Sequence, residues 1–560
     1  MQAEKSFKFQ LLILFFCIVV AGSGCATYGQ GVKKTLDLVK QENFCLAEEE
    51  LKKALKPDGD DRFLYHVELG SITRLGRQYS VSNEYFETAE RIAEDLYTKR
   101  SKDVLSSMLL NPRQSPYQGN DHEHIYINYF KALNHMDLGL SGLLEPNTSF
   151  ENARIELRRL DYKLKSYEFD KGNYKEVEDK KKKTFVRLLD IFSKLQGNWL
   201  DKDWLKFRED AFARYVSGII YEISGMYDDA RISYNNAAQL YEEGYVKQYS
   251  LDPQIIERAW FDTVRMMIKS RSYSKSEWKS FASKKLCPEK IKALEEYCLS
   301  NGEIVVIEHL GLSPERKELN LHLNVDLDSK SIYMYPVLMG SPSDKNDQRA
   351  WFFLLYADKG ILSMVNNYSS GGLSSTVKGL QRKTIGIAPL WSVAENIGLI
   401  GALSSGGVRV TVPYYSPLKT KFGMSKMVVN GEFKFLVKGE DLGQISLQNQ
   451  LLNSGKDLNE ALARETLKNL VAYQSGSEFG DFAVLGGKLF SAITSAAETR
   501  NWLMLPSEIR VNRIDVPPGE HSVEITTYDV SGQVISTLKE NININPGEVK
   551  VLFKRTLGNY

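Results

Sequence analysis

The period of the hydrophobic pattern changes near residue 300. Before that point, apolar residues recur every three or four positions, as they do on one face of an amphipathic helix. Beyond it, residues 303–310 and 319–325 alternate or stay apolar over the length of a strand. Residues 441–472 return to helical spacing, and the residues after 504 are strand-like again. The pattern predicts an α+β chain, with helices first and a mixed, β-rich region after them.

Pairs of helices recur in the first 300 residues with the spacing of tetratricopeptide (TPR) repeats. In the clearest pair, small residues let two antiparallel helices approach closely, tyrosines fill the space between them, and a glycine makes the turn. The residues of this pair are Gly218, Tyr221, Gly225, Tyr227, Ala230, Tyr234 and Ala237. Five of them, Gly218, Tyr221, Ala230, Tyr234 and Ala237, resemble the tetratricopeptide consensus.

Three further pairs repeat part of this pattern. They contain Leu69, Gly70, Tyr79, Phe86 and Ala89; Ala132, Gly139, Ala153 and Leu157; and Phe44, Ala47, Leu51 and Ala54. Insertions at 100–123 and 160–205, and a shorter one at 140–149, interrupt the spacing. Four copies in a row predict an interrupted TPR-like α-solenoid over residues 25–300, a fold that offers a large surface to partner proteins.

Three units are expected after residue 300. They are a β-rich domain at 301–440, a helical segment packed on it at 441–503, and a small C-terminal β-sandwich at 504–560. Further strands are expected at 332–339, 408–414 and 427–437, and a second helix at 482–499. Turns of the Pro-Gly type between alternating strands are the signal for the sandwich. Residues 516–525 resemble the PEGA-type module of bacterial surface proteins.

One apolar segment, 384–403, lies inside the β-rich domain between stretches rich in serine and glycine. Two interpretations are open: the segment is buried in that domain, or it is a mobile insertion that docks on a membrane or a partner. Glu395 and Asn396 at its centre argue against a helix that spans lipid. Burial is the favoured interpretation.

The first 24 residues have the features of a secretory signal peptide. Two lysines precede an apolar run at 11–20, and small residues at 21–24 precede Cys25. The apolar run is shorter than the about 20 residues that a membrane span needs. Cys25 in this position resembles the lipobox cysteine of bacterial lipoproteins, and Ala26 after it implies lipid anchoring in an outer membrane, facing the periplasm. A plain signal peptide with an incidental cysteine is the alternative.

Composition and cysteine count narrow the class of protein. The 560 residues carry 72 Lys+Arg and 71 Asp+Glu, so the net charge of +1 lacks the basic excess that is usual in nucleic-acid-binding proteins. Five cysteines are too few for a disulfide scaffold. Cys287 and Cys298 bracket a short helical stretch, and their spacing allows a disulfide in an oxidising periplasm. Buried free thiols are the favoured interpretation.

The sequence offers little catalytic chemistry. The motifs GxSxG, HExxH, GxGxxG and GxxxxGK[ST] are absent, and the SxxK at 375–378 lacks its partner motifs. Among seven histidines only His122 and His124 are clustered, and an exposed loop explains them better than a metal site. No enzymatic activity, cofactor or metal is therefore expected.

An ordered set of short matches resembles one family of bacterial lipoproteins. The matching residues are Arg154, Arg158 and Arg159; 302–306; 409–413; 461–473; and Glu498, Arg500, 502–509, Arg513 and 517–519. The family is largely uncharacterised, and its members have tetratricopeptide-like N-terminal halves. They are often encoded beside small lipoproteins that resemble activators of peptidoglycan synthases. The resemblance implies an outer-membrane lipoprotein of the same architecture.

Three functions are consistent with the sequence. The favoured one is a non-catalytic scaffold or regulator of cell-envelope assembly that binds envelope proteins through its repeats. The second is an accessory to the export or assembly of surface polysaccharide or protein, with residues 384–403 at a membrane channel. The third is a hydrolase acting on peptidoglycan, which would need two carboxylates converging in a cleft.

Overall fold

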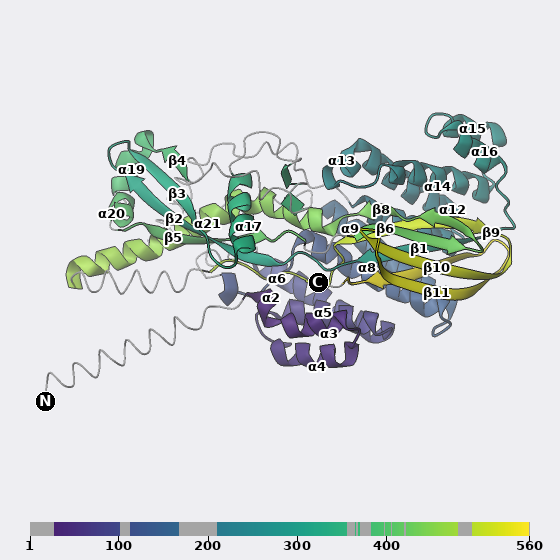
Figure 1. Cartoon of the computed structure of the whole chain (residues 1–560), viewed down its shortest axis with the longest axis horizontal. Helices are drawn as coiled ribbons and strands as arrows, with labels where there is room; N and C mark the ends of the chain where they lie inside the picture. The colour runs from purple at the N-terminus through teal and green to yellow at the C-terminus, as the bar shows by residue number, and fades with distance from the viewer. Residues whose placement is uncertain are drawn as a thin grey trace.

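Helices form the first part of the structure, and three small β-sheets with further helices form the second (Figure 1). This α+β arrangement confirms the prediction from the hydrophobic pattern. The computed structural model describes residues 27–100, 112–166, 210–355, 364–365, 368–369, 382–396, 398–404, 406–418, 422–479 and 496–558. The expected signal peptide and Cys25 lie outside the described residues.

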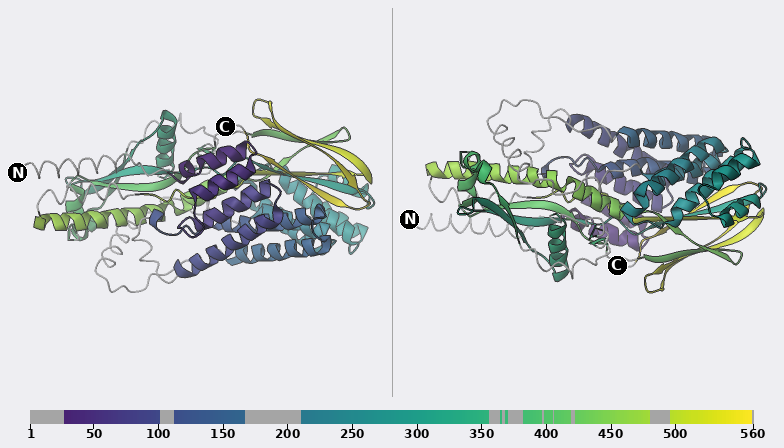
Figure 2. Two further views of the ribbon diagram at one scale, coloured as in Figure 1. Left: turned by 90° about the horizontal axis from the view of Figure 1, so that it is seen from below. Right: turned by 90° about the horizontal axis from the view of Figure 1, so that it is seen from above.

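Helical hairpins follow one another along the N-terminal region, and Figure 2 shows their helices side by side. The elements are α2 (Tyr28–Gly31), α3 (Lys33–Lys40), α4 (Phe44–Ala54), α5 (Arg62–Leu75), α6 (Tyr79–Arg100), η1 (Pro112–Gln114), α8 (Asp121–Leu140), α9 (Pro146–Ser166), α11 (Ala211–Ile223), α12 (Tyr227–Leu240), η2 (Tyr241–Tyr245), α13 (Val246–Tyr249), α14 (Gln254–Ser270), α15 (Lys275–Ala282) and α16 (Pro288–Glu295). Helix α3 packs on α4, α5 on α6, α8 on α9 and α11 on α12, and α14 packs on α12. Each expected repeat copy lies in one of the first four pairs.

Small residues bring the helices of two pairs together. A methyl group added at Gly218 on α11 would lie 2.6 Å from the ring of Tyr234 on α12, which is closer than van der Waals contact allows. In the α5–α6 pair, a methyl group at Gly70 would lie 2.7 Å from the ring of Phe86. Gly225 connects α11 to α12 with a φ of 73°, a conformation that favours glycine. Both pairs therefore place a glycine opposite an aromatic ring.

The other residues of the clearest repeat differ in burial. Ala230 and Ala237 are fully buried in the helical core. Tyr221 and Tyr227 are only half-buried and pack against the edge of that core. The alanines therefore set the spacing between the helices, and these two tyrosines cover its rim.

The expected insertions interrupt the helices less than the sequence suggests. Half of the insertion at 140–149 is helical, and residues 141–145 connect α8 to α9. Residues 101–111 and 167–209, which contain much of the two longer insertions, lie outside the described residues.

In the described part of the chain, the strands form three sheets of four strands each. The strands are β1 (Gly302–Leu310), β2 (Arg316–Asp326), β3 (Ser331–Val337), β4 (Lys383–Gly386), β5 (Val408–Tyr415), β6 (Phe422–Val429), β7 (Glu432–Phe435), β8 (Val437–Glu440), β9 (Glu508–Val516), β10 (Gly519–Asp529), β11 (Val534–Ile544) and β12 (Val549–Thr556). Sheet A has the order β12-β1-β9-β8, sheet B the order β4-β3-β2-β5, and sheet C the order β11-β10-β6-β7. Strands β1 and β12 are parallel, and the other neighbours are antiparallel.

Sheet A lies between the helices and sheet C. On its strand β1, Val305 and Ile307 belong to the core that contains the helices, whereas Ile304 and Val306 belong to the core shared with sheet C. Every residue of β1 is buried, as expected for a strand that is covered on both faces. This part of the molecule therefore has three layers: helices, sheet A and sheet C.

The C-terminal strands pair with strands from much earlier in the chain. Strand β12 lies beside β1, β9 lies between β1 and β8, and β10 pairs with β6. The units expected at 301–440 and 504–560 therefore share two sheets. The strand expected at 427–437 is divided among β6, β7 and β8. The local pattern does not show these pairings, because partners such as Glu303 and Val549 are far apart in the sequence.

A second core surrounds sheet B. Sheet B packs with α17 (Pro342–Leu354), α19 (Trp391–Asn396), α20 (Leu399–Ser404) and the long helix α21 (Leu442–Phe479). Helix α21 confirms the helical segment expected from 441 onward. It begins in the core of the helical region at Leu442 and continues along sheet B with Leu447 and Leu451. Residues 482–495 of the next expected helix lie outside the described residues, and 496–499 have no regular secondary structure.

The apolar segment 384–403 packs into the second core. Ala394 and Leu399 are fully buried there, and Ala402 and Leu403 are each 1 % exposed. Other residues of the segment are exposed, among them Ala388, Pro389 and Val393, so the segment is only partly buried. Among the described residues, no helix is long and apolar enough to cross a membrane.

We expect Gly218→Ala to destabilise the protein by about 1–3 kcal/mol, because the added methyl group overlaps the Tyr234 ring in a well-packed core. The midpoint of chemical unfolding measures the effect. Gly31→Ala is the control, since Gly31 is also helical and has nothing within 4 Å of the added methyl group. Equal stability of the two variants would contradict the assigned packing of α11 and α12.

Candidate functional site

Residues 496–507, which have little regular secondary structure, lie against the helical region. Two glutamates on the helices accept hydrogen bonds from the main chain of this segment. Glu123 on α8 accepts from the N–H of Trp502 at 2.7 Å, and Glu68 on α5 accepts from the next two residues at 2.8 and 3.1 Å. The helices therefore hold the segment in part by its main chain.

The side chain of Trp502 is fully buried among the helices. Its Nε1 donates to Ser71 Oγ at 2.9 Å. Its ring lies 5.6 Å from the ring of Phe86 and 5.8 Å from the ring of Phe130, measured between centroids. Phe86 is the ring that packs on Gly70, so the close packing of α5 and α6 also positions one wall of the Trp502 pocket.

Arg500 connects the same segment to two loops of the helical region. One of its guanidinium nitrogens donates to the carbonyl oxygens of Pro112 and Ser115 at 2.7 and 2.9 Å, and another donates to Asp61 at 3.0 Å. Glu498 accepts from it at 2.7 Å within the segment. Guanidinium carries five donors in a fixed plane, and here most of them are used.

Burial controls the protonation of the two glutamates. It raises the pKa of Glu68 to about 8, although the two main-chain N–H groups act in the opposite direction. Burial also raises the pKa of Glu123. Tyr28 donates to Glu68 at 3.3 Å and Tyr117 donates to Glu123 at 2.8 Å. Both carboxyl groups are therefore tied into hydrogen bonds from the helical region and from the bound segment.

A buried cluster of charges joins the helices to sheet A further along. Glu222 on α11 accepts from Arg265 and Lys269 on α14 at 2.7 and 2.8 Å. It also accepts from Arg513 on β9 at 2.9 Å, and Arg513 donates to Glu303 on β1 at 2.8 Å. These five side chains are at most 5 % exposed. Removing one partner of a buried ion pair costs about 3–5 kcal/mol, because the other charge is left uncompensated.

Four helices, α5, α8, α11 and α14, share one role. Glu68 lies on α5, Glu123 on α8, Glu222 on α11 and Arg265 on α14, and all four contact sheet A or residues 496–507. This side of the helical region is therefore covered by the β-region of the same chain.

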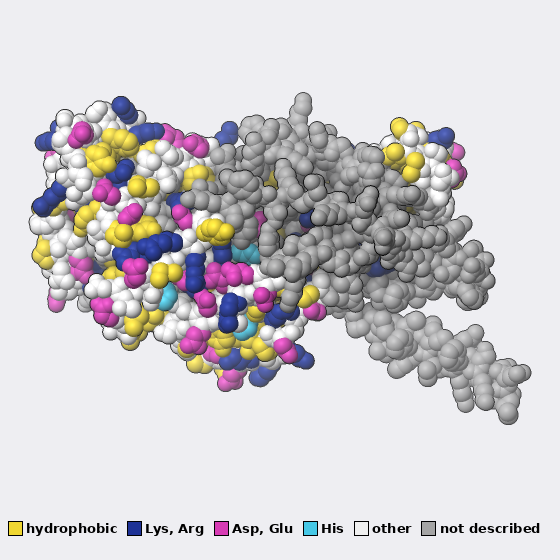
Figure 3. Space-filling model, turned by 180° about the vertical axis from the view of Figure 1, so that it is seen from behind, with side chains coloured by type: hydrophobic (Ala, Val, Ile, Leu, Met, Phe, Trp, Pro, Cys, Tyr) yellow, Lys and Arg dark blue, Asp and Glu magenta, His cyan; other side chains and the backbone are white. Residues whose placement is uncertain are grey.

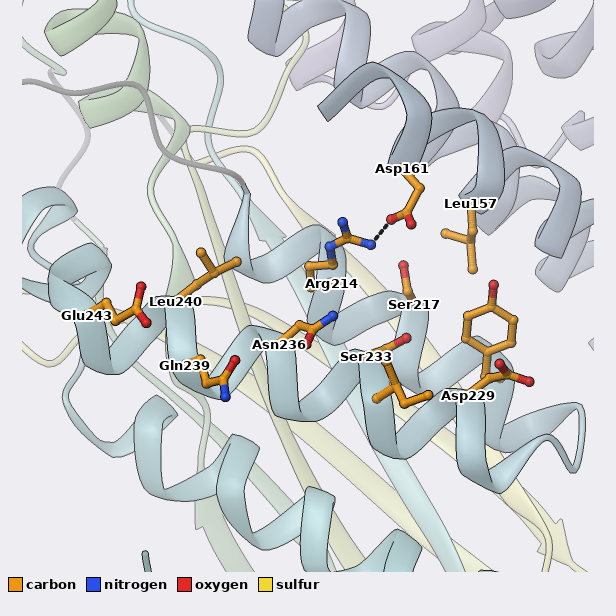
Figure 4. Close-up of a pocket in the computed structure, with 12 residues that line it drawn as sticks. Leu157, Asp161, Arg214, Ser217, Asp229, Ser233, Asn236, Gln239, Leu240 and Glu243 are labelled. Carbon is orange, nitrogen blue, oxygen red and sulfur yellow. Dashed lines mark ion pairs between the residues drawn. The ribbon is translucent and has the colours of Figure 1, made fainter. Parts of the chain in front are cut away.

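Among the described residues, another side of the helical region is not covered by the β-region. A groove of about 520 Å³ lies between α9 and α12, with α11 between them (Figure 4). Arg214 on α11 points toward Asp161 on α9 and forms an ion pair with it. Ser217, Ser233 and Asn236 contribute hydroxyl and amide groups to the wall. Such side chains both donate and accept hydrogen bonds, which suits the main chain of an extended ligand.

The residues of the clearest repeat lie in three places: inside the helical hairpin, in the groove, and at the buried cluster of charges. Gly218, Ala230 and Ala237 lie inside the hairpin. Tyr221 lines the open groove. Tyr234 reaches the buried cluster, where its hydroxyl donates to Glu222 at 2.9 Å and accepts from Arg513 at 3.0 Å.

The cysteines and the histidine pair differ from expectation. Cys45, Cys287 and Cys298 are free thiols; Cys45 and Cys298 are exposed and Cys287 is half-exposed, so the interpretation of buried thiols is wrong. A disulfide between Cys287 and Cys298 stays a prediction for an oxidising compartment. His122 and His124 lie in the first turn of α8 rather than in a loop, and burial lowers the pKa of His122 to about 3. Among the described residues, no three His, Cys, Asp or Glu side chains are placed to hold a metal ion.

The buried carboxylates are the residues that sequence reasoning misses. Each of Glu68, Glu222 and Glu303 is an acidic residue within a run of mostly apolar residues. An acidic residue on the apolar face of a predicted element is the signal that could identify them, because burying a charge is unfavourable without a partner.

We expect the stability of the wild-type protein to fall, relative to Glu68→Gln, as the pH rises from about 5 to 8. The folded pKa of about 8 lies above the ordinary 4.5, so folding takes up a proton between these values. The contribution is complete below the unfolded pKa and decreases by about 1 kcal/mol per pH unit above it. Unfolding midpoints measured at several pH values give the two slopes.

The Gln variant has one hydrogen-bond acceptor fewer, so its free energy of unfolding differs from that of the wild type at every pH. The informative quantity is therefore the slope of the free energy of unfolding against pH. Glu84→Gln, at an exposed position of α6, is the control and should keep the wild-type slope. Identical slopes for wild type and Glu68→Gln would show that Glu68 is ionised in the folded protein.

Comparison with known proteins adds nothing to this geometry. No family model, curated protein or solved structure matches the chain. The likeness to a family of bacterial lipoproteins therefore stays a prediction, and the functional argument depends on the residues described above.

Proposed function

We propose that the protein is a non-catalytic scaffold of the cell envelope, anchored by lipid on Cys25 and facing the periplasm. Its TPR-like solenoid binds an extended segment of a partner protein. The observation that carries the proposal is the groove between α9 and α12.

The packing of the elements supports a solenoid followed by a sandwich. Four consecutive helix pairs share the helical core, and two of them place glycine against an aromatic ring. Such stacks bind extended partners along their surface. Sheets A and C share an apolar core that contains Ile304, Ile525 and Ile544, as the two sheets of a β-sandwich do.

The chemistry of the groove favours a peptide segment with a basic residue. Asn236 and Gln239 lie one turn apart on α12 and can bond to a peptide main chain. Ile232, which is 47 % exposed, offers an apolar contact, and Asp229 adds negative charge. Basic and acidic side chains are interspersed over the described part of the face in Figure 3, so local contacts rather than a long-range field select the partner.

We expect Asn236→Arg to prevent partner binding, because the longer charged side chain occupies the groove. A photo-crosslinking amino acid at Gln239, which lines the groove and is exposed, reports binding in intact envelopes. The proposal predicts one adduct of defined mass. Its yield should fall about tenfold in Asn236→Arg, the equivalent of about 1.4 kcal/mol of lost affinity.

The matched control is Asn235→Arg, the same substitution one position earlier on α12 and outside the groove lining. It should keep the adduct, and the melting temperatures of both variants report their folding. Absence of an adduct in the wild type, or equal yields in the two variants, would contradict the groove as the partner site.

We expect Cys25→Ala to lose lipid and membrane attachment, because the thiol of Cys25 is the acceptor in the proposed modification. Intact-mass measurement and fractionation of detergent-solubilised envelopes test this. Cys17→Ala, in the apolar run of the signal peptide, should behave as wild type. A Cys25→Ala protein that stays in the membrane fraction at unchanged mass would overturn the anchoring.

A further inference from the structure

A second cavity lies on the β side of the helical region. Its volume is about 600 Å³, and residues of α14, α16, β1, β7 and β9 line it. Buried side chains of Arg265, Glu303 and Arg513 contribute to its wall, together with exposed residues such as Lys290 and Phe435. The cavity therefore connects solvent to the buried cluster between α11, α14 and sheet A.

Cationic and acidic side chains both line the cavity: the cations are Arg258, Arg265, Lys290, Lys434 and Arg513, and the carboxylates are Glu257, Glu296, Glu303 and Asp515. Behind this wall, Lys269 is paired with Glu222, and Asp262 is paired with Arg258 and Arg265. Burial opposes the charged form of Arg265 and Lys269, but the carboxylates raise the pKa of both above its ordinary value, so both keep their protons. Burial raises the pKa of Glu303, which can only reduce the negative charge.

Two features of the cavity wall favour a bound anion. The buried Nε of Arg513 has no hydrogen-bond partner among the described residues. Lys434 also lines the cavity and donates from Nζ to the carbonyl oxygen of Arg513 at 3.3 Å. Burial is the main cause that lowers the pKa of Lys434; Arg258 and Lys290 lower it further, whereas Glu432 and Asp515 act in the opposite direction. An anion beside Arg513 and Lys434 would accept a hydrogen bond from the unpaired donor and stabilise the buried ammonium group.

We propose that this cavity binds the oxyanion group of a small ligand, a carboxylate or a phosphate, against Arg513 and Lys434. Guanidinium and ammonium groups bond to both kinds of oxyanion. Phe261, Tyr297 and Phe435 also line the cavity and pack against the apolar part of the ligand. The side chains of Arg513 and Lys434 are both hydrogen-bond donors, which favours an anion over a metal ion at this point of the wall.

Calorimetric titration of the purified full-length protein tests the proposal. Inorganic phosphate and benzoate are titrated separately, with chloride at equal ionic strength as the reference. Saturable binding of phosphate alone indicates a phosphorylated ligand, binding of benzoate alone indicates an organic acid, and binding of both indicates recognition of the shared oxyanion. Lys434→Gln should lower the affinity about tenfold, as expected for the loss of one charge-assisted hydrogen bond.

Two more lysines keep the test decisive. Lys290→Gln changes an exposed residue of the cavity lining and should weaken binding less than Lys434→Gln does. Lys426→Gln, beside the exposed ring of Phe433 and outside the cavity lining, should leave binding unchanged. Absence of saturable binding, or affinities that neither Lys434→Gln nor Lys290→Gln lowers, would overturn the proposal. The melting temperature of each variant shows whether it is folded. If Lys434→Gln is unfolded, the affinity of Lys290→Gln tests the proposal instead.

Discussion

Buried polar groups between the helical region and the β-region determine how the two parts fit together. An apolar contact alone allows many relative positions, whereas a buried carboxylate has to meet its donors. Glu68 and Glu123 meet the main chain of residues 502–504, and Glu222 meets Arg513. A displacement of one part past the other would leave these groups without partners. These hydrogen bonds therefore specify the relative position of the helical and β parts.

This contact also decides which surfaces remain for a partner. Helices α5, α8, α11 and α14 contact sheet A or residues 496–507. In the TPR-like solenoid proposed above, the chain's own segment therefore occupies part of the surface that such proteins offer to ligands. Among the described residues, the groove between α9 and α12 is not covered by the β-region. A partner that binds there loses little of its affinity to ordering the scaffold.

Local packing could be predicted from the sequence, and long-range pairing could not. Gly218 and Tyr234 are close in the sequence, so the period of small and aromatic residues shows their contact in advance. Strand positions follow from alternation, but their partners do not, because a short apolar run fits many neighbours. The family resemblance includes Arg500, Trp502 and Arg513, and the structure places all three where the two parts meet. The position of a buried carboxylate on an apolar face can be seen in the sequence, but its partner cannot, because Glu222 and Arg513 are far apart along the chain.

Helix α11 connects the two candidate binding surfaces. It supplies Ser217 and Tyr221 to the open groove, and the next residue, Glu222, to the charged cluster behind the second cavity. Groove and cluster therefore use different sides of one helix. A partner that moved α11 would change the distances from Glu222 to Arg265 and Arg513. Those distances determine how far Glu222 neutralises the two guanidinium groups, and therefore the electrostatic potential at an anion in the cavity. Because buried ion pairs tolerate little displacement, binding in the groove and binding in the cavity are coupled to the extent that either one moves this helix.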